Sequence, residues 1–199
     1  MLLRIVISKF LTCAFLFYAT ASSATVINIG ATQYGFAFPT DPAPVVGQII
    51  IPFSTSGPLN QLTLSAGTYT VTNATGLPGA NPDFTATRFN DMGGANWAWN
   101  FIIADDSDKK VVLYGEAGGL SSTKSGIADQ LSVKNFMSTF HLSTTTTLDF
   151  MIRDYYLADN AGGVAINITA VPEPEIYLML VAGLGLLGFM AYRRKEISM

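Results

Sequence analysis

The sequence predicts an all-β domain, an antiparallel β-sandwich or jelly roll, flanked by a short segment of different character at each end. Three observations favour this class: apolar and polar residues alternate along many short stretches, turn-forming residues bound each stretch, and residues 25–170 contain no convincing helical period. Strands of this kind bury one face against other strands. Residues 25–170 are also long enough for one domain with a substantial core.

Alternation places the individual strands. In order, they are expected at residues 25–29, 48–53, 62–64, 68–72, 84–89, 97–103, 110–114, 135–142, 147–153 and 164–169. A turn at Ala66 and Gly67 predicts a hairpin between the two strands that flank it, and a glycine-bearing loop predicts a second hairpin between the last two strands. Residues 38–45, 74–82 and 115–129 are expected to be loops, which is where binding residues usually lie.

Residues 1–24 have the pattern of a secretory signal peptide. Arg4 and Lys9 precede an uncharged, mostly apolar run at residues 10–19, and small residues follow up to Ala24, after which cleavage is expected. The alternative is a retained anchor, but the run is shorter than the ~20 apolar residues that span a bilayer. The only cysteine, Cys13, lies in this segment, so the mature chain would have no disulfide, thiol catalysis or cysteine metal site.

The C-terminal segment predicts a single transmembrane helix. Residues 176–192 carry no charge and would span about 25 Å as a helix. Arg193, Arg194 and Lys195 follow directly, and such a cluster tends to stay in the cytoplasm. We therefore expect residues 25–170 on the far side of the inner membrane.

Pro172 and Pro174 hold Glu173 extended just before this helix, because neither proline can donate a backbone hydrogen bond. The order of Val171-Pro172-Glu173-Pro174, an apolar span and a basic cluster resembles the PEP-CTERM sorting signal of Gram-negative bacteria. The resemblance covers about the last 28 residues, within 171–199. An ordinary C-terminal anchor, whose prolines merely end the domain, is the alternative.

The resemblance implies a transient stay in the inner membrane, processing by exosortase, a membrane transpeptidase, and delivery to the cell surface or the extracellular space. In that family the signal commonly occurs in organisms that make extracellular polysaccharide. Residues 25–170 contain eleven acidic and six basic residues, a net charge of −5 that argues against a nucleic-acid partner. The leading expectation is a structural or adhesive component associated with exopolysaccharide in a biofilm matrix.

A calcium-dependent, lectin-like module is the alternative function. Asp154, Asp159 and Asn160 gather oxygen ligands between the last two strands, and calcium favours such ligands. The stretch loosely resembles the Asp, Asn and Gly loops of calcium-dependent bacterial sandwich lectins, in which the ion holds sugar hydroxyls. A tight turn is the other interpretation of the same residues. We expect no cofactor, with calcium as the single candidate.

Trp97 and Trp99 share one face of a predicted strand. Exposed, the rings could stack on sugars; buried, they would belong to the core of the sandwich. Catalysis has little support, because His141 is the only histidine and no nucleophile elbow or metal-ligand spacing accompanies it. We therefore expect no enzyme, and a polysaccharide hydrolase with two facing carboxylates is the less favoured alternative.

Overall fold

The computed structural model describes residues 24–36, 43–89, 96–154, 156–172 and 174–197. The chain divides into two compact units, of which one spans Ala24–Val171 and the other contains helix α4 (Pro174–Ile197). The predicted signal peptide lies outside the described residues except for Ala24, the first residue of β1.

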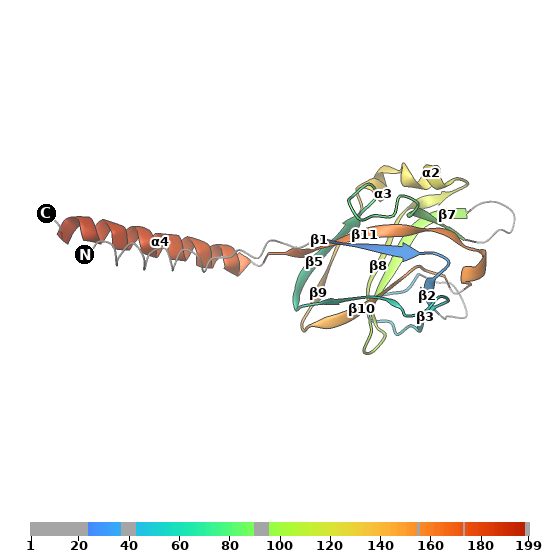
Figure 1. Cartoon of the computed structure of the whole chain (residues 1–199), viewed down its shortest axis with the longest axis horizontal. Helices are drawn as coiled ribbons and strands as arrows, with labels where there is room; N and C mark the ends of the chain where they lie inside the picture. The colour runs from blue at the N-terminus through green and yellow to red at the C-terminus, as the bar shows by residue number, and fades with distance from the viewer. Residues whose placement is uncertain (1–23, 37–42, 90–95, 155, 173, 198–199) are drawn as a thin grey trace. The chain divides into compact units, whose positions relative to one another are not determined.

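Strands dominate the unit that spans Ala24–Val171 (Figure 1). They are β1 (Ala24–Gly30), β2 (Tyr34–Phe36), β3 (Pro52–Ser54), β4 (Asn60–Leu64), β5 (Gly67–Asn73), β6 (Thr85–Phe89), β7 (Asn96–Asp105), β8 (Val111–Ser121), β9 (Met137–Leu142), β10 (Thr146–Met151) and β11 (Ala161–Val171). Two short helices, α2 (Lys124–Ala128) and α3 (Leu131–Lys134), follow β8, and a 3₁₀ turn, η1 (Leu157–Asp159), precedes β11.

Nine of these strands form one antiparallel sheet, while β2 and β3 pair with each other. Strand β7 pairs with β8 along one edge. Along its other edge, it pairs with β6 near its N-terminal end and with β10 near its C-terminal end. Strand β11 pairs with β1 along one edge. Along its other edge, it pairs with β6 near its N-terminal end and with β5 near its C-terminal end. Because β6 pairs with both β7 and β11, it joins the two halves of the sheet.

The main hydrophobic core combines side chains from both halves. Trp99 and Phe101 of β7 and Ile166 of β11 are fully buried in the same cluster. The Trp99 ring lies 5.4 Å from the Phe101 ring at an angle of 85° and 4.7 Å from the Phe136 ring. Burial of each such side chain contributes about 1.5–3 kcal/mol, so this core is the main source of stability for a domain that holds no cysteine.

A smaller cluster covers the other face of β7. Ile102 and Ala104 of β7 pack there with Phe36 of β2, Ile50 and Met151. Two backbone hydrogen bonds hold β2 in place over this cluster. The Ile152 amide donates to the Tyr34 carbonyl at 3.1 Å, and the Phe36 amide donates to the Asp154 carbonyl at 3.1 Å. Half of β7 is therefore buried on both faces, which leaves only its first residues free to line a surface site.

The all-β, antiparallel class predicted from the sequence is confirmed. The strand order differs from the two separate sheets of a sandwich or jelly roll, because β6 makes the sheet continuous. Both predicted hairpins are wrong. Strands β4 and β5 are adjacent in the sequence, but β4 pairs with β10 while β5 pairs with β9 and β11. Strand β10 likewise pairs with β4 and β7, not with β11.

The loop predicted at residues 115–129 is also wrong for most of its length. Strand β8 continues to Ser121, and α2 follows with Thr123 as its N-cap, whose hydroxyl accepts a hydrogen bond from the Gly126 amide at 3.0 Å. Ile127 anchors this helix in the core. Ile127 is the buried side chain of α2, and its contact with the core explains why this small, polar stretch forms a helix.

Helix α4 begins at Pro174, a residue suited to a first helical turn because its missing N–H has no helical partner to lose. It includes the uncharged stretch from residue 176 to residue 192, where the sequence predicts a transmembrane helix. Among the described residues, however, no helix meets the length and hydrophobicity expected of a membrane span.

An ion pair between the partly exposed Lys109 and the buried Asp149 connects the turn between β7 and β8 to β10. The Asp149 carboxylate is fully buried; it accepts a hydrogen bond from Gln61 at 2.7 Å and lies 3.3 Å from the Lys109 ammonium. Lys109 also pairs with Asp106, and its backbone is left-handed, with φ +59°. Burial would lower the pKa of Lys109, but hydrogen bonds with Asp106 and Asp149 outweigh it, so the pKa is raised.

We expect Lys109→Met to lower the free energy of unfolding by about 2–3 kcal/mol, because it leaves the Asp149 carboxylate buried without its cation. The cost should fall below that of a fully buried pair, since the Lys109 side chain is 36% exposed. Urea unfolding measures the change. The control Lys110→Met breaks the exposed pair with Asp108 and should cost little. Equal losses in the two variants would show that Asp149 does not depend on Lys109.

Candidate functional site

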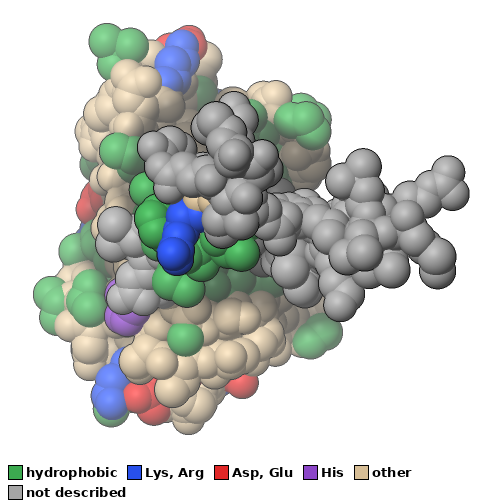
Figure 2. Space-filling model, turned by 90° about the vertical axis from the view of Figure 1, so that its left-hand side faces the viewer, with side chains coloured by type: hydrophobic (Ala, Val, Ile, Leu, Met, Phe, Trp, Pro, Cys, Tyr) green, Lys and Arg blue, Asp and Glu red, His purple; other side chains and the backbone are tan. Residues whose placement is uncertain are grey.

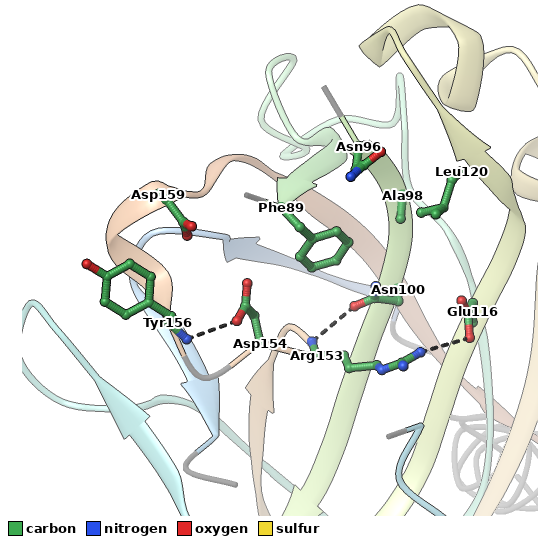
Figure 3. A pocket seen from close by; sticks show the side chains of 10 residues that line it. All are labelled: Phe89, Asn96, Ala98, Asn100, Glu116, Leu120, Arg153, Asp154, Tyr156 and Asp159. Carbon is green, nitrogen blue, oxygen red and sulfur yellow. Dashed lines mark hydrogen bonds and ion pairs between the residues drawn. The ribbon is translucent and has the colours of Figure 1, made fainter. Parts of the chain in front are cut away.

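A cleft of about 520 Å³ opens between β6, β7 and β8 and the connection from β10 to β11 (Figure 3). Its lining combines aromatic, amide and charged side chains: Phe89, Asn96, Ala98, Asn100, Glu116, Leu120, Arg153, Asp154, Tyr156 and Asp159. These residues come from four separate parts of the sequence.

The alternation of β7 builds the floor of the cleft. Trp97, Trp99 and Phe101 point to one side of the strand, and Ala98 and Asn100 point to the other. The small Ala98 side chain leaves room between neighbouring strands. On the adjacent side, Gly162 at the start of β11 has φ +76°, and a Cβ there would lie 2.4 Å from the Ala86 carbonyl oxygen. Glycine thus allows β11 to approach β6 beside the cleft.

Asn100 is the buried polar group of this floor. Its side chain lines the cleft although the residue is only 2% exposed. The Oδ1 atom accepts a hydrogen bond from the Arg153 backbone amide at 3.0 Å (Figure 3). The Nδ2 group makes no hydrogen bond within the part of the chain that the structure describes. Its two donors are therefore available to whatever occupies the cleft.

A hydrogen-bonded network fixes Arg153, the one cationic side chain among the described residues of the lining. The Arg153 guanidinium donates to the Tyr114 hydroxyl at 3.1 Å, and that hydroxyl donates to the Glu116 carboxylate at 2.6 Å. Arg153 also lies 3.6 Å from the same carboxylate. Burial, and then the hydrogen bond to Glu116, raise the pKa of Tyr114, so its hydroxyl remains a donor at neutral pH. Glu116 thus balances the charge of Arg153.

The structure brings together two of the three residues predicted to bind calcium. Asp154 and Asp159 both line the cleft, and in Figure 3 their carboxylates point toward the same space. Asp154 Oδ1 accepts a hydrogen bond from the Tyr156 amide at 2.9 Å. Asn160, in contrast, is buried and donates to the Ala31 carbonyl at 3.2 Å, away from the cleft lining. Within the described residues, no three His, Cys, Asp or Glu side chains form a group suited to a metal ion.

The predicted aromatic pair does not form a stacking surface. Trp99 is fully buried in the core, so its ring offers no face to a sugar; of the two interpretations of this residue, burial in the core is the one that holds. Trp97 is half-buried, with the Lys124 ammonium 6.0 Å from the centre of its ring. The aromatic residues that do line the cleft are Phe89 and Tyr156. Tyr156 stands next to the predicted acidic residues, but no sequence signal joined Phe89 to them.

The residues of the predicted sorting signal lie where β11 ends and α4 begins. Val171 is the last residue of β11, Pro172 is exposed and Pro174 is the first residue of α4, while Glu173 lies outside the described residues. Three basic residues, Arg193, Arg194 and Lys195, fall within α4. The Arg193 guanidinium lies 6.0 Å from the centre of the Phe189 ring, one helical turn earlier.

Residues 170–195 match the family model described as the PEP-CTERM protein-sorting motif. The chain carries a PEP-CTERM sorting motif. The match spans the strand end, the two prolines, the apolar stretch and the basic cluster. It covers the C-terminal segment alone and gives no family for residues 25–170.

Other comparisons add little to this identification. No curated protein matches this chain. Among solved structures, the crystal structure of a Burkholderia pseudomallei antigen and type I fimbria protein is similar over 76% of this chain and 100% of that chain, with 14% sequence identity and a TM-score of 0.23. A TM-score of this size does not establish a shared fold.

The raised pKa of Tyr114 makes the stability of this protein sensitive to alkaline pH. The contribution of this hydroxyl is complete below the ordinary tyrosine pKa of 10.0 and is lost as the pH rises toward the higher folded-state pKa. Tyr114→Phe should cost about 1 kcal/mol at neutral pH through lost hydrogen bonds. It should also make the fall in stability above about pH 10 shallower, as measured by urea unfolding across that range. An unchanged alkaline slope would contradict this role.

Proposed function

We propose that this protein is exported, held at the inner membrane as a precursor, processed there by an exosortase-type transpeptidase and delivered to the cell surface or the extracellular matrix. The observation that carries the proposal is the match of residues 170–195 to the PEP-CTERM sorting motif. The fold supports it as well. Strand β11 makes its last pair at Val171, opposite Thr68, so removal of the segment that follows leaves the sheet intact.

For the ectodomain we propose a structural or adhesive role in association with extracellular polysaccharide. The low charge of its surface supports this. On the face shown in Figure 2, the Lys and Arg side chains of the described residues do not form a continuous basic patch. Residues 25–170 carry a net charge of −5, which opposes binding to nucleic acid. The cleft offers amide, carboxylate and aromatic groups together, a combination suited to polyhydroxylated ligands.

We propose that the ectodomain binds its polymer without cleaving it. The carboxylates of Glu116, Asp154 and Asp159 share the cleft, and a hydrolase would need two such groups on opposite sides of the scissile bond. Glu116 already accepts a hydrogen bond from Tyr114, and Asp154 accepts one from the Tyr156 amide, so both have structural partners. An assay of new reducing ends on candidate polymers tests this proposal, and their release would contradict it.

Sorting should depend on the Pro-Glu-Pro step. Replacing Pro172, Glu173 and Pro174 together with alanine should leave full-length precursor in the inner membrane, because without the two prolines the residues before α4 can join it as a helix. Membrane fractionation followed by intact mass analysis measures the outcome.

The control for this experiment is Glu175→Ala, one residue beyond the Pro-Glu-Pro step, which should mature normally. If the triple variant also matures and leaves the membrane, Pro-Glu-Pro is not the sorting signal. A loss of both variants before fractionation would instead indicate unstable protein, which a melting curve of each variant detects.

A second candidate function is calcium-dependent carbohydrate binding, favoured by the shared position of Asp154 and Asp159 in the cleft. Calcium binds carboxylate oxygens, and one ion between these two groups could hold sugar hydroxyls. Calcium-dependent binding predicts that millimolar calcium raises the melting temperature of the protein and that Asp159→Ala abolishes this shift.

The matched control is Asp83→Ala, which removes an exposed carboxylate that does not line the cleft and should keep the calcium shift. An unchanged melting temperature of the wild-type protein in calcium would eliminate this candidate. Sorting through the PEP-CTERM motif would be unaffected by that result.

A further inference from the structure

We propose that the cleft binds a neutral or amino sugar unit of a polysaccharide directly, without a metal ion. This inference rests on the proposed association of the ectodomain with polysaccharide, and it adds the site, the class of sugar and the side chains that hold it.

The first argument is the unpartnered donor on the floor of the cleft. Asn100 is more than nine-tenths buried, its Oδ1 is held by the Arg153 amide, and its Nδ2 has no partner within the described residues. Asn100 Nδ2 is not among the side-chain atoms that are both enclosed and without a partner, so it reaches the open cleft, where water or a ligand oxygen can accept its hydrogen bonds. A hydroxyl oxygen of a bound sugar is a suitable acceptor for this group.

The second argument is the presence of acceptors beside that donor. Asp159 makes no hydrogen bond within the described part of the chain, and Asp154 uses one carboxylate oxygen for the Tyr156 amide. A sugar hydroxyl donates one hydrogen bond and accepts others, so adjacent hydroxyls match a site that offers both amide donors and carboxylate acceptors. The combination on this cleft wall is therefore specific for a ligand rich in hydroxyl groups.

The third argument is the apolar surface of the cleft. Phe89 and Tyr156 line it with the small Ala98 and with Leu120, and Tyr156 is 58% exposed. The C–H faces of a pyranose ring are apolar and pack well on aromatic rings. The cavity volume of 520 Å³ lies within the range of about 300–1,000 Å³ that is typical of small-ligand sites.

Charge decides the class of sugar. Among the described residues, the lining contains three carboxylates and one guanidinium, and Arg153 is already paired with Glu116. The cleft is therefore net negative, as is the ectodomain, with its net charge of −5. A uronic acid would meet repulsion from Asp154 and Asp159, whereas a neutral sugar would not and a protonated amino sugar would be attracted.

Native gel electrophoresis in gels that contain a polymer tests the proposal, because binding retards the protein. The full-length chain is kept in a detergent without a sugar headgroup, with excess EDTA. The probes are a neutral β-glucan, a galactomannan, chitosan oligomers and alginate. We expect retardation by at least one neutral or amino polymer and none by alginate.

Two variants assign the binding to the cleft. Tyr156→Ala removes an exposed ring, and Asn100→Asp keeps the acceptor for the Arg153 amide while removing the Nδ2 donors. Each should weaken binding of the neutral polymers about tenfold or more. The comparison uses the neutral polymers because the added carboxylate of Asn100→Asp would itself attract an amino polymer. Met137→Ala is the control, because Met137 is 71% exposed on β9 and does not line the cleft. Melting curves establish that the variants are folded, and Tyr156→Ala keeps the test valid if Asn100→Asp is unstable.

Several outcomes would overturn the inference, and they differ from failure of the proposed function. Wild-type-like binding by Tyr156→Ala would place the site elsewhere and leave the polysaccharide association standing. Preference for alginate would overturn the charge argument. Binding that appears only when calcium replaces EDTA would overturn direct recognition. If the wild-type protein binds none of the polymers, both this inference and the proposed polysaccharide association fail, while sorting is untouched.

Discussion

The arrangement of the whole ectodomain depends on the pairing of β7, a strand with partners along both edges and covered for half its length on both faces. Trp99 and Phe101 of β7 anchor the main core, and Ile102 and Ala104 anchor the smaller cluster on its opposite face. A strand fixed in this way cannot slip by one residue, because a slip would exchange every core side chain with a solvent-facing one. Its register therefore also fixes the direction in which Asn100 points.

The cleft follows from this constraint and from the two connections beside it. Strand β2 packs over Ile102 and Ala104 of β7 and does not extend over Asn100. The hydrogen bond from the Phe36 amide to the Asp154 carbonyl holds the segment after β10 at the rim of the cleft. Strand β6 closes the other side, since it pairs with both β7 and β11. The binding groups thus stand on rigid, hydrogen-bonded backbone, which reduces the entropy lost when a ligand binds.

The sequence predicted most of the strands and the C-terminal signal, but it missed β2, the end of β8 and the site. Alternation predicts which residues form a strand and share a face, as for Trp97 and Trp99, but it carries no information on which strands pair. Both hairpins failed for that reason. The cleft combines Phe89, Glu116 and Tyr156 from distant segments, so only the sheet topology brings them together. The sorting signal was recognisable because its parts are contiguous in the chain.

The central claim is that this protein reaches the cell exterior after processing at both ends. The most direct test is the intact mass of the mature protein isolated from the envelope and the culture medium of its own host. The account predicts a mass that lacks residues 1–24 and everything beyond the Pro-Glu-Pro region. A mature protein that retains residues 176–199 would contradict it, because the C-terminal segment would then be a permanent part of the molecule.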